Sequence, residues 1–291
     1  MRFLSAVLVL LFSATGAWAW GPLTAPEADF GDALVLDIRS PDDFDRGHIP
    51  GAVNTPYGEY RGPGSNPGRV PDLADLQETL RDAGATYGRP VLVVHQGKNS
   101  SDFGAAARVY WTLKSAGFGE LSILNGGFNA WLDLGLEPST DESDPAPSDI
   151  TLTWSDRWMI DSAGVEKVVD GESEAVLLDA RPKDFFTGQK KHNAAREAGT
   201  LRGALNLVQS SWFSGGSPVI APSEEMISTV REIAAEKGDA PLVSFCNTGH
   251  WAATNWFAAS ELAGIENVRL YPESMVGWTL LGNAVVDGSM N

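Results

Sequence analysis

Short apolar runs alternate with longer segments of helical periodicity along most of the chain. The first half contains three such runs, at 33–39, 90–95 and from Leu121 onward, and two predicted helices, at 72–83 and 103–117. Apolar strands that alternate with helices are typical of a mostly parallel sheet with helices on both faces. The pattern therefore predicts an α/β fold.

The same pattern occurs a second time. Four pairs of segments correspond: 33–39 with 176–181, 47–54 with 199–206, 90–95 with 241–246, and 121–131 with 268–278. A repeat of this length indicates a tandem duplication. The acidic, Pro/Ser-rich stretch 139–150 between the copies is interpreted as a linker. We expect two domains, 22–138 and 151–291.

Cys246 is the only cysteine, and it stands between an apolar run, 241–245, and a helical pattern, 252–262. At such a strand-to-helix turn, backbone N–H groups converge on the positive end of a helix dipole, which favours a thiolate. A buried cysteine acting as a small hydrophobe is the alternative. The polar loop that follows, with Gly249 to let the chain curl around the sulfur, favours a reactive role.

The spacing of the two copies differs at the cysteine. His95 and Cys246 are 151 residues apart, but Trp111 and Phe257 are only 146 apart, so the first copy has a loop about five residues longer. The first copy also has His95 in place of the cysteine. We therefore expect the first domain to be a structural partner without a nucleophile.

The second copy carries an insertion of its own. Asp37 and Asp179 are 142 residues apart, whereas Gly51 and Gly203 are 152 apart, which places about ten extra residues near 190–198. Basic residues collect there: Lys190, Lys191, His192 and Arg196, with Arg202 just beyond. The stretch is either a solvated loop or a segment that folds over Cys246 and binds an anion.

Residues 1–19 resemble a secretory signal, with an early positive charge, an apolar core and the small-x-small end Ala17-Trp18-Ala19. An uncleaved membrane anchor is the alternative. We expect a periplasmic or secreted protein without stable membrane insertion after cleavage. The formal net charge of −17 makes nucleic acid an unlikely partner. With one cysteine, the chain has no internal dithiol cycle, so Cys246 reacts with an external partner.

Phosphoryl transfer by a Cys-x5-Arg loop is disfavoured, because Ala252 occupies the arginine position. The chain instead resembles the tandem-domain rhodanese family, which includes thiosulfate and 3-mercaptopyruvate sulfurtransferases. The resemblance rests on Leu-Asp-Ile-Arg39 and Gly47-His-Ile-Pro-Gly-Ala52 in the first copy, and on Asp179-Ala-Arg181 and Cys246-x-x-Gly-x-x-Ala252 in the second. It covers both halves and implies an inactive first domain and a catalytic second one.

The resemblance also implies roles for individual residues. Cys246 would form a persulfide, and the loop Asn247, Thr248, Gly249, His250 and Trp251 would cradle it. Asp179 and Arg181 would brace the turn beneath the site, and a direct catalytic role is the alternative. Thr248 matches a hydroxyl that binds substrate in mercaptopyruvate enzymes, and a plain turn hydroxyl is the alternative.

This sequence departs from the family pattern in its charges. Thiosulfate-type loops carry Arg and Lys, whereas only His250 can carry charge here, and Phe185 replaces an expected substrate-binding arginine. We therefore expect Lys190, Lys191, Arg196 and Arg202 to supply anion contacts. Trp212 and Trp251 are candidates for apolar walls, and plain core residues are the alternative.

The predicted reaction transfers a sulfane sulfur from thiosulfate, or from a related donor such as 3-mercaptopyruvate, through Cys246 to cyanide or a thiol. The acceptor could also be a partner protein. The prediction includes no metal and no cofactor. A periplasmic sulfane-sulfur carrier with little turnover of its own is the alternative. A metal site of Cys246, His250 and His192 is a remote option that lacks a known ligand spacing.

Overall fold

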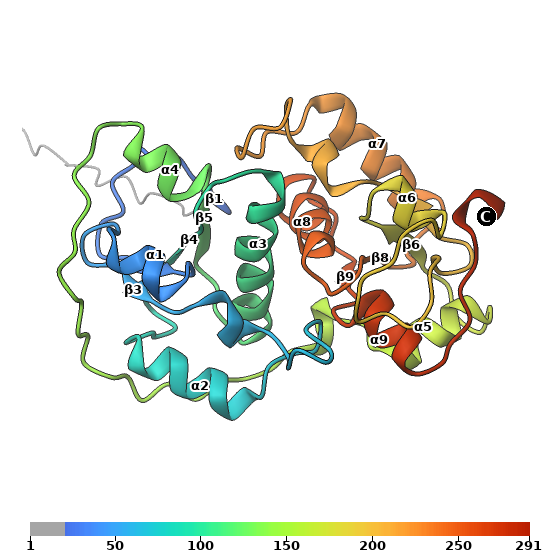
Figure 1. Ribbon diagram of the computed structural model, residues 1–291, viewed down its shortest axis with the longest axis horizontal. Helices are drawn as coiled ribbons and strands as arrows, with labels where there is room; N and C mark the ends of the chain where they lie inside the picture. The colour runs from blue at the N-terminus through green and yellow to red at the C-terminus, as the bar shows by residue number, and fades with distance from the viewer. Residues whose placement is uncertain (1–20) are drawn as a thin grey trace, which may run out of the picture.

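The computed structural model describes residues 21–291, so the predicted signal segment 1–19 lies outside the described residues. Two parallel sheets lie side by side along the long axis of the molecule, each with its own helices (Figure 1). The described part of the chain has no helix that is both long and apolar enough to cross a membrane.

The first sheet has the strand order β1-β5-β4-β2-β3, and all of its neighbours are parallel. Its strands are β1 (Leu23–Thr24), β2 (Leu34–Asp37), β3 (Val53–Asn54), β4 (Val91–Val94) and β5 (Leu121–Leu124). All residues of β2, β4 and β5 are buried. These strands are apolar on both faces because helices cover both faces of the sheet, as the sequence pattern predicts.

The helices of the first domain are α1 (Pro41–Asp45), η1 (Tyr57–Tyr60), α2 (Leu73–Asp82), α3 (Ser100–Ser115) and α4 (Gly127–Leu132). The longest is α3, which begins where the Asn99 side chain accepts hydrogen bonds from the N–H groups of Ser101 and Asp102. Most of its residues are buried, because α3 lies between the first sheet and the second domain (Figure 1).

The second sheet, in the order β7-β6-β8-β9, repeats the first without the edge strand β1. Its strands are β6 (Val176–Asp179), β7 (Leu205–Asn206), β8 (Leu242–Phe245) and β9 (Val268–Leu270). Around them lie η2 (Asp156–Trp158), α5 (Ser162–Val169), α6 (Lys183–Phe186), η3 (Gln209–Trp212), α7 (Glu224–Ala235), α8 (Trp251–Phe257), η4 (Ala258–Leu262), α9 (Ser274–Leu280) and η5 (Gly288–Met290). A single parallel bridge from Met159 to Leu270 replaces β1. The predicted duplication is thus present in the strand order.

The two domains meet where α3 packs against α8 (Figure 1). The ring of Phe257 meets Phe103 at 5.5 Å and Tyr110 at 5.0 Å, both edge to face. Polar contacts flank these rings, since Glu261 accepts hydrogen bonds from Lys114 Nζ (2.8 Å) and the Tyr110 hydroxyl (2.8 Å). One cluster of buried apolar side chains runs through both domains, so the two copies share a core.

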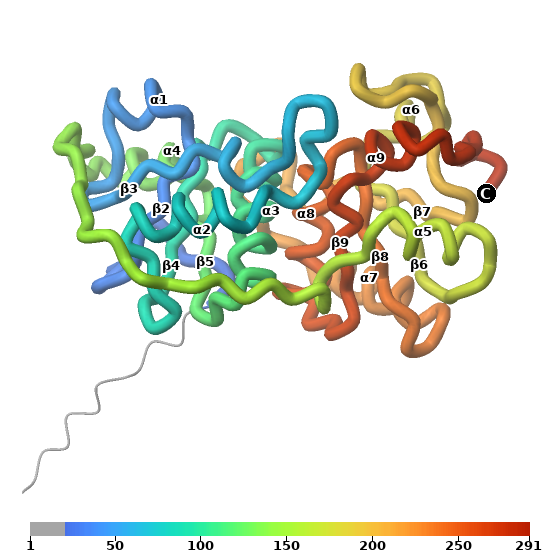
Figure 2. Tube along the Cα trace, turned by 90° about the horizontal axis from the view of Figure 1, so that it is seen from below, coloured from blue at the N-terminus to red at the C-terminus, as the bar shows by residue number. Residues whose placement is uncertain are grey.

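The segment between the domains is attached to the first domain along its length. His48 and Ser139 exchange two backbone hydrogen bonds of 2.9 Å, and Arg81 Nε donates to the carbonyl of Ile150, whose side chain is buried. Figure 2 shows this stretch, in green, running along the first domain to α5. Because the stretch is fixed by these contacts, it holds the second domain close to the first.

Candidate active site

Cys246 directly follows β8 at the carboxyl end of the second sheet, and only 1% of it is exposed. It lies in a cavity of about 270 Å³. On the second-domain side, the cavity is lined by the loop residues Asn247, Thr248, His250 and Trp251 and by His192 of the insertion. The structure thus brings four of the five predicted loop residues to the cavity wall, and Gly249 holds the turn with a φ of 68°.

The first domain supplies the opposite wall of the cavity, which no sequence pattern predicted. Tyr57, Arg61 and Ser101 all line the cavity. Arg61 Nη2 donates to the carbonyl of Thr248 at 2.8 Å, and its guanidinium lies 5.0 Å from the centroid of the Tyr57 ring. These contacts fix a permanent cation beside the cysteine loop. Among the residues that line this cavity, Arg61 alone is an arginine or lysine.

The ring of His250 links the two domains through hydrogen bonds to Tyr57 and Ser101 of the first domain. Its Nε2 lies 2.7 Å from the carbonyl of Ser101, which can only accept, so Nε2 carries the proton. Nδ1 is then an acceptor, and the Tyr57 hydroxyl donates to it at 3.0 Å. Burial, with a further contribution from Arg61, lowers the pKa of His250 to about 4. His250, the one loop residue able to carry charge, is therefore neutral near pH 7.

Ser274, at the start of α9, holds the cysteine loop from below. Its Oγ accepts hydrogen bonds from the N–H groups of Cys246 (3.0 Å) and Gly249 (3.2 Å) and donates to the carbonyl of Tyr271 (2.8 Å). Ser274 has a φ of 52° and is the one non-glycine residue with positive φ in the described part of the chain. That conformation costs about 1–2 kcal/mol for an L-residue, so it points to a specific use of the hydroxyl.

The first domain shows what Ser274 replaces. Phe128 N–H donates to the carbonyl of His95 just as Met275 N–H donates to that of Cys246. The residue before Phe128 is Gly127, which has a φ of 65°. The same backbone turn therefore occurs in both copies, with a glycine where there is no cysteine and a strained serine where there is one. Sequence reasoning missed Ser274 because a serine gives no sign of positive φ.

The backbone N–H groups of the loop divide into two sets. Those of Cys246 and Gly249 are bound to Ser274 Oγ, so these two do not take part in the predicted cradle. Within residues 21–291, no protein acceptor is found for those of Asn247, Thr248 and His250. All three residues line the cavity, so these N–H groups are available to an anion bound there.

Asp179 and Arg181 form a buried pair beside the loop. Arg181 Nη2 donates to Asp179 Oδ2 at 2.6 Å and to the carbonyl of Gly199 at 2.8 Å, and its Nη1 lies 3.4 Å from Asn247 Oδ1. The pair does not line the cavity. Its contacts are those of a brace that ties β6 to the loop. Asp37 and Arg39 repeat the arrangement in the first domain.

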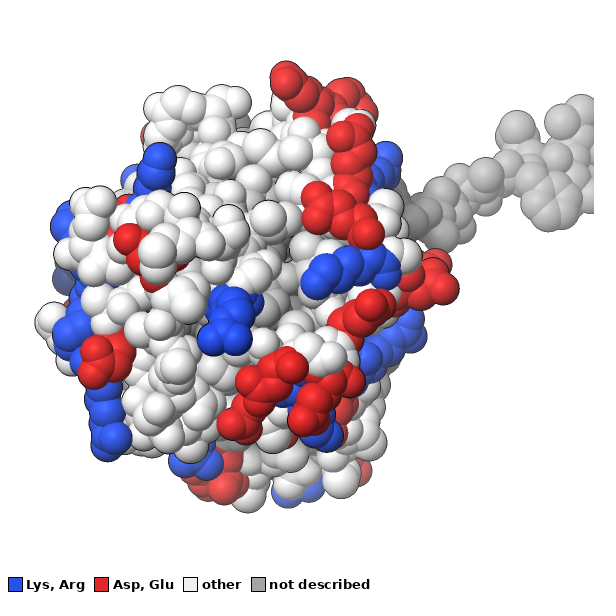
Figure 3. Space-filling view, turned by 90° about the vertical axis from the view of Figure 1, so that its right-hand side faces the viewer, with Lys and Arg blue, Asp and Glu red and all other residues white. Residues whose placement is uncertain are grey.

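The predicted anion-binding insertion contacts the cavity only through His192. Burial, together with Arg61, lowers the pKa of His192. Lys190, Lys191, Arg196 and Arg202 are exposed. Lys190 pairs with Asp184 at 2.7 Å, and Lys191 Nζ donates to the carbonyl of Ala195 at 2.6 Å. On the face at the second-domain end, basic residues are scattered among acidic ones and form no single patch (Figure 3).

Of the two tryptophans predicted as apolar walls, only Trp251 lines the cavity. Trp212 is fully buried and donates to Asn255 Oδ1 at 2.8 Å, so it belongs to the core and is not a cavity wall. Trp251 lines the cavity, and Phe185 packs edge-on against it at 6.2 Å. Phe185, which stands where an arginine was expected, therefore supports an apolar wall.

In the first domain, His95 occupies the position that corresponds to Cys246. His95, 1% exposed, lies 3.1 Å through Nδ1 from Asp102 Oδ2, and the N–H groups of Gly97 and Lys98 also bind that carboxylate. These contacts lower the pKa of Asp102 to about 2 against the opposing effect of burial. The first copy thus offers a fixed carboxylate in place of a nucleophile.

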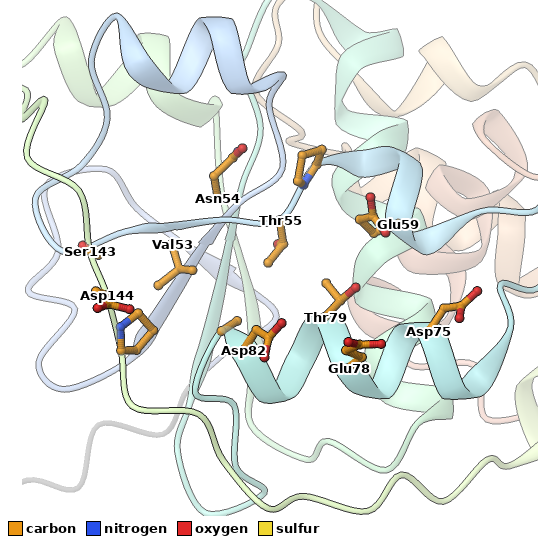
Figure 4. A pocket seen from close by; sticks show the side chains of 13 residues that line it. Val53, Asn54, Thr55, Glu59, Asp75, Glu78, Thr79, Asp82, Ser143 and Asp144 are labelled. Carbon is orange, nitrogen blue, oxygen red and sulfur yellow. The ribbon is translucent and has the colours of Figure 1, made fainter.

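A larger cavity lies elsewhere. It occupies about 580 Å³ between β3, η1 and α2, and acidic side chains, including Glu59, Glu78 and Asp82, surround it (Figure 4). None of the residues near Cys246 borders it. Within the described residues there is also no group of three His, Cys, Asp or Glu side chains arranged to hold a metal. The remote metal site of Cys246, His250 and His192 would need a ring nitrogen of His250, but both are hydrogen-bonded to Tyr57 and Ser101.

Comparison with known proteins agrees with this geometry. The family model of the rhodanese-like domain matches the chain twice, over residues 17–134 and 165–281. A thiosulfate sulfurtransferase of Pseudomonas aeruginosa is 27% identical over 87% of this chain and 90% of its own. A protein named "Probable 3-mercaptopyruvate sulfurtransferase" from the same organism is 29% identical over 85% and 89%, respectively.

Two solved structures share the fold. The Tum1 protein of Saccharomyces cerevisiae has a TM-score of 0.74 at 19% identity and covers 92% of this chain and 99% of its own. An anaerobic ergothioneine biosynthesis enzyme of Chlorobium limicola has a TM-score of 0.76 at 20% identity over 90% of this chain, which spans 66% of that longer protein. The fold and site define a sulfur-transferring enzyme of tandem architecture. The chain belongs to the rhodanese family and is a sulfurtransferase.

The strained serine gives a testable pair of variants. Ser274→Ala and Ser274→Gly both remove the acceptor of two loop N–H groups, so we expect each to lower kcat/KM for sulfur transfer by about tenfold or more. Ser274→Gly should lose about 1 kcal/mol less unfolding free energy than Ser274→Ala, because glycine tolerates the positive φ. Steady-state kinetics and urea unfolding measure the two effects.

Ser228→Ala on the exposed face of α7 is the matched control and should change neither quantity. Wild-type kcat/KM in both Ser274 variants would show that the hydroxyl does not hold the loop.

Proposed function

We propose that this protein is an exported sulfurtransferase that carries a sulfane sulfur on Cys246 as a persulfide. The donor is a small anion such as thiosulfate or 3-mercaptopyruvate, and the acceptor is cyanide or a thiol, including a thiol on a partner protein. The observation that carries the proposal is the position of Cys246, alone of its kind, in a cavity between loop N–H groups and a fixed arginine.

In the first half-reaction, the Cys246 thiolate attacks the outer sulfur of thiosulfate. A sulfur–sulfur bond forms on the enzyme, the bond within thiosulfate breaks, and sulfite leaves with the electron pair. The persulfide then carries the negative charge. The free N–H groups of Asn247, Thr248 and His250 are suited to stabilise it, since no acceptor within residues 21–291 occupies them.

In the second half-reaction, cyanide or a thiolate attacks the outer sulfur of the persulfide. The new carbon–sulfur or sulfur–sulfur bond forms as the enzyme's sulfur–sulfur bond breaks, and Cys246 leaves as the thiolate. No net oxidation of the protein occurs, which suits a chain with a single cysteine. His250 transfers no proton, because both of its nitrogens are bound and its pKa is about 4.

Recognition of an anionic donor depends on Arg61. His192 and His250 have lowered pKa values, and the exposed cations of the insertion do not line the cavity. Arg61 uses Nε and Nη2 on the carbonyls of Pro67 and Thr248. Its guanidinium is therefore oriented before a sulfonate or carboxylate arrives.

Export rests on residues 1–19. Cleavage after Ala19 would leave Trp20 as the first residue of the mature protein. We expect the protein in the periplasmic or secreted fraction with that N-terminus, measured by fractionation and intact mass. A full-length protein retained in the membrane fraction would favour the uncleaved anchor.

A sulfane-sulfur carrier is the second candidate, favoured by the low exposure of Cys246, which would protect a persulfide from solvent. The two functions differ in turnover. Sustained thiocyanate production from thiosulfate and cyanide identifies the enzyme, whereas one sulfur per chain identifies the carrier.

Cys246→Ser should abolish sulfur transfer and leave the fold intact, because serine is nearly isosteric but a far weaker nucleophile. Intact mass spectrometry of the wild type after thiosulfate, and separately after 3-mercaptopyruvate, should show a gain of about 32 Da, one sulfur atom, that the variant lacks. Thiocyanate production by the variant near the wild-type rate would contradict the assignment.

Arg61→Gln should raise KM for an anionic donor by about tenfold or more, equivalent to roughly 1.4 kcal/mol. Transfer from the persulfide to a neutral thiol should change much less. The matched control is the triple variant Lys190→Gln, Lys191→Gln and Arg196→Gln, which removes charge outside the cavity. If the triple variant raises KM and Arg61→Gln does not, anion binding belongs to the insertion.

A further inference from the structure

A second arginine of the first domain lies behind the cysteine loop. Arg108, in the middle of α3, is fully buried. Its Nη2 donates to the carbonyls of Gly68 (2.9 Å) and Arg69 (3.0 Å), and its guanidinium lies 5.0 Å from the centroid of the Trp111 ring. Nε and Nη1 are buried and have no partner among the described residues. Nor does any carboxylate of residues 21–291 pair with it.

Arg108 is in close contact with the loop that contains Cys246. A Cβ atom added to Gly249 would lie 2.5 Å from Arg108 Nη1. Only a glycine therefore allows the loop to pass this close to the guanidinium, and the φ of 68° at Gly249 requires the same residue. The unpaired Nη1 abuts the turn that curls around the sulfur.

An unpaired buried cation is costly. Removing a charge from water is unfavourable even after the protein relaxes, and a nearby negative charge offsets this cost. Two carbonyl dipoles and an aromatic face supply part of that compensation. Burial lowers the pKa of Arg108 to about 10, while negative charge on Tyr57 or Cys246 opposes the change. Cys246 is the group there that is negative during the reaction.

The other titratable groups around Cys246 supply neither an anion for Arg108 nor a further unpaired cation for the sulfur. The pKa of Tyr57 is raised and that of His250 is lowered to about 4, so both are neutral near pH 7. His192 also has a lowered pKa. The other groups are paired or distant: Arg181 is bound to Asp179, and Glu273 is bound to Asn66 and Ser162. Among the described residues, the permanent cations next to the cysteine loop without a carboxylate partner are Arg61, which contacts Thr248, and Arg108, which contacts Gly249, both of the first domain.

We propose that Arg108 is the buried counter-charge of the anionic sulfur on Cys246, acting through the loop from the opposite domain. It is a positioning residue, because it stabilises the thiolate and the persulfide without lining the donor cavity. Arg61 contacts the donor cavity, whereas Arg108 stabilises negative charge on the sulfur from behind the loop. The persulfide part of this inference rests on the proposed function, and the thiolate part does not.

The test measures the rate of Cys246 alkylation by iodoacetamide against pH in purified protein. Arg108→Met keeps the length and apolar stem but removes the charge, and we expect its rate at pH 7 to fall about tenfold with the half-maximal rate about one pH unit higher. Arg108→Lys keeps a charge and should restore the wild-type midpoint to within a few tenths of a unit. Lys114→Gln, which removes another α3 cation at the domain interface, should leave the midpoint unchanged.

The outcomes separate charge from structure. A wild-type midpoint in Arg108→Met would overturn the proposal, as would equal effects of Met and Lys, which indicate a packing role. If the variants do not fold, the salt dependence of alkylation in the wild type provides a second test. A buried charge is screened weakly, so the midpoint should stay constant between about 0.05 and 1 M salt, and a midpoint that rises with salt would assign the effect to surface charge. Alkylation needs no sulfur donor, so the absence of sulfur transfer would count against the proposed function alone.

Discussion

The packing of α3 against α8 is the constraint on which the site depends. Phe103 and Tyr110 of one domain and Phe257 of the other form an edge-to-face cluster inside a core that both domains share. This cluster sets the separation of the two helices. Since α8 begins at the end of the cysteine loop and α3 begins beside Ser101, the same packing determines which first-domain side chains reach Cys246.

The two copies have diverged around one backbone geometry. Both keep the buried Asp-x-Arg brace and the same turn after their last strand. One copy ends its central strand with a histidine bound to Asp102, and the other ends it with Cys246. A glycine in the first turn becomes a strained serine in the second. These differences lie next to the nucleophile, where Ser274 adopts a positive φ that is unfavourable for a non-glycine residue.

Sequence patterns predicted the features that are local. Strands such as β4 and β8 are continuous apolar runs, and the position of Cys246 follows from the strand-to-helix pattern around it. Arg61 and Arg108 were not predicted, because their proximity to Cys246 depends on how two domains dock and not on any spacing within one. The basic insertion contributes only His192 to the cavity. Its charges are close to the site in sequence, but Lys190 is paired with Asp184 and exposed.

The position of the stretch from Ser139 to Ile150 has a further consequence. Hydrogen bonds to His48 and Arg81 fasten it to the first domain before the second begins. The cavity at the cysteine takes Cys246 from the second domain and Arg61 from the first. A gene encoding either half alone would specify an exposed apolar helix face and an incomplete site. The two copies therefore form one structural unit, with a shared core and a shared cavity.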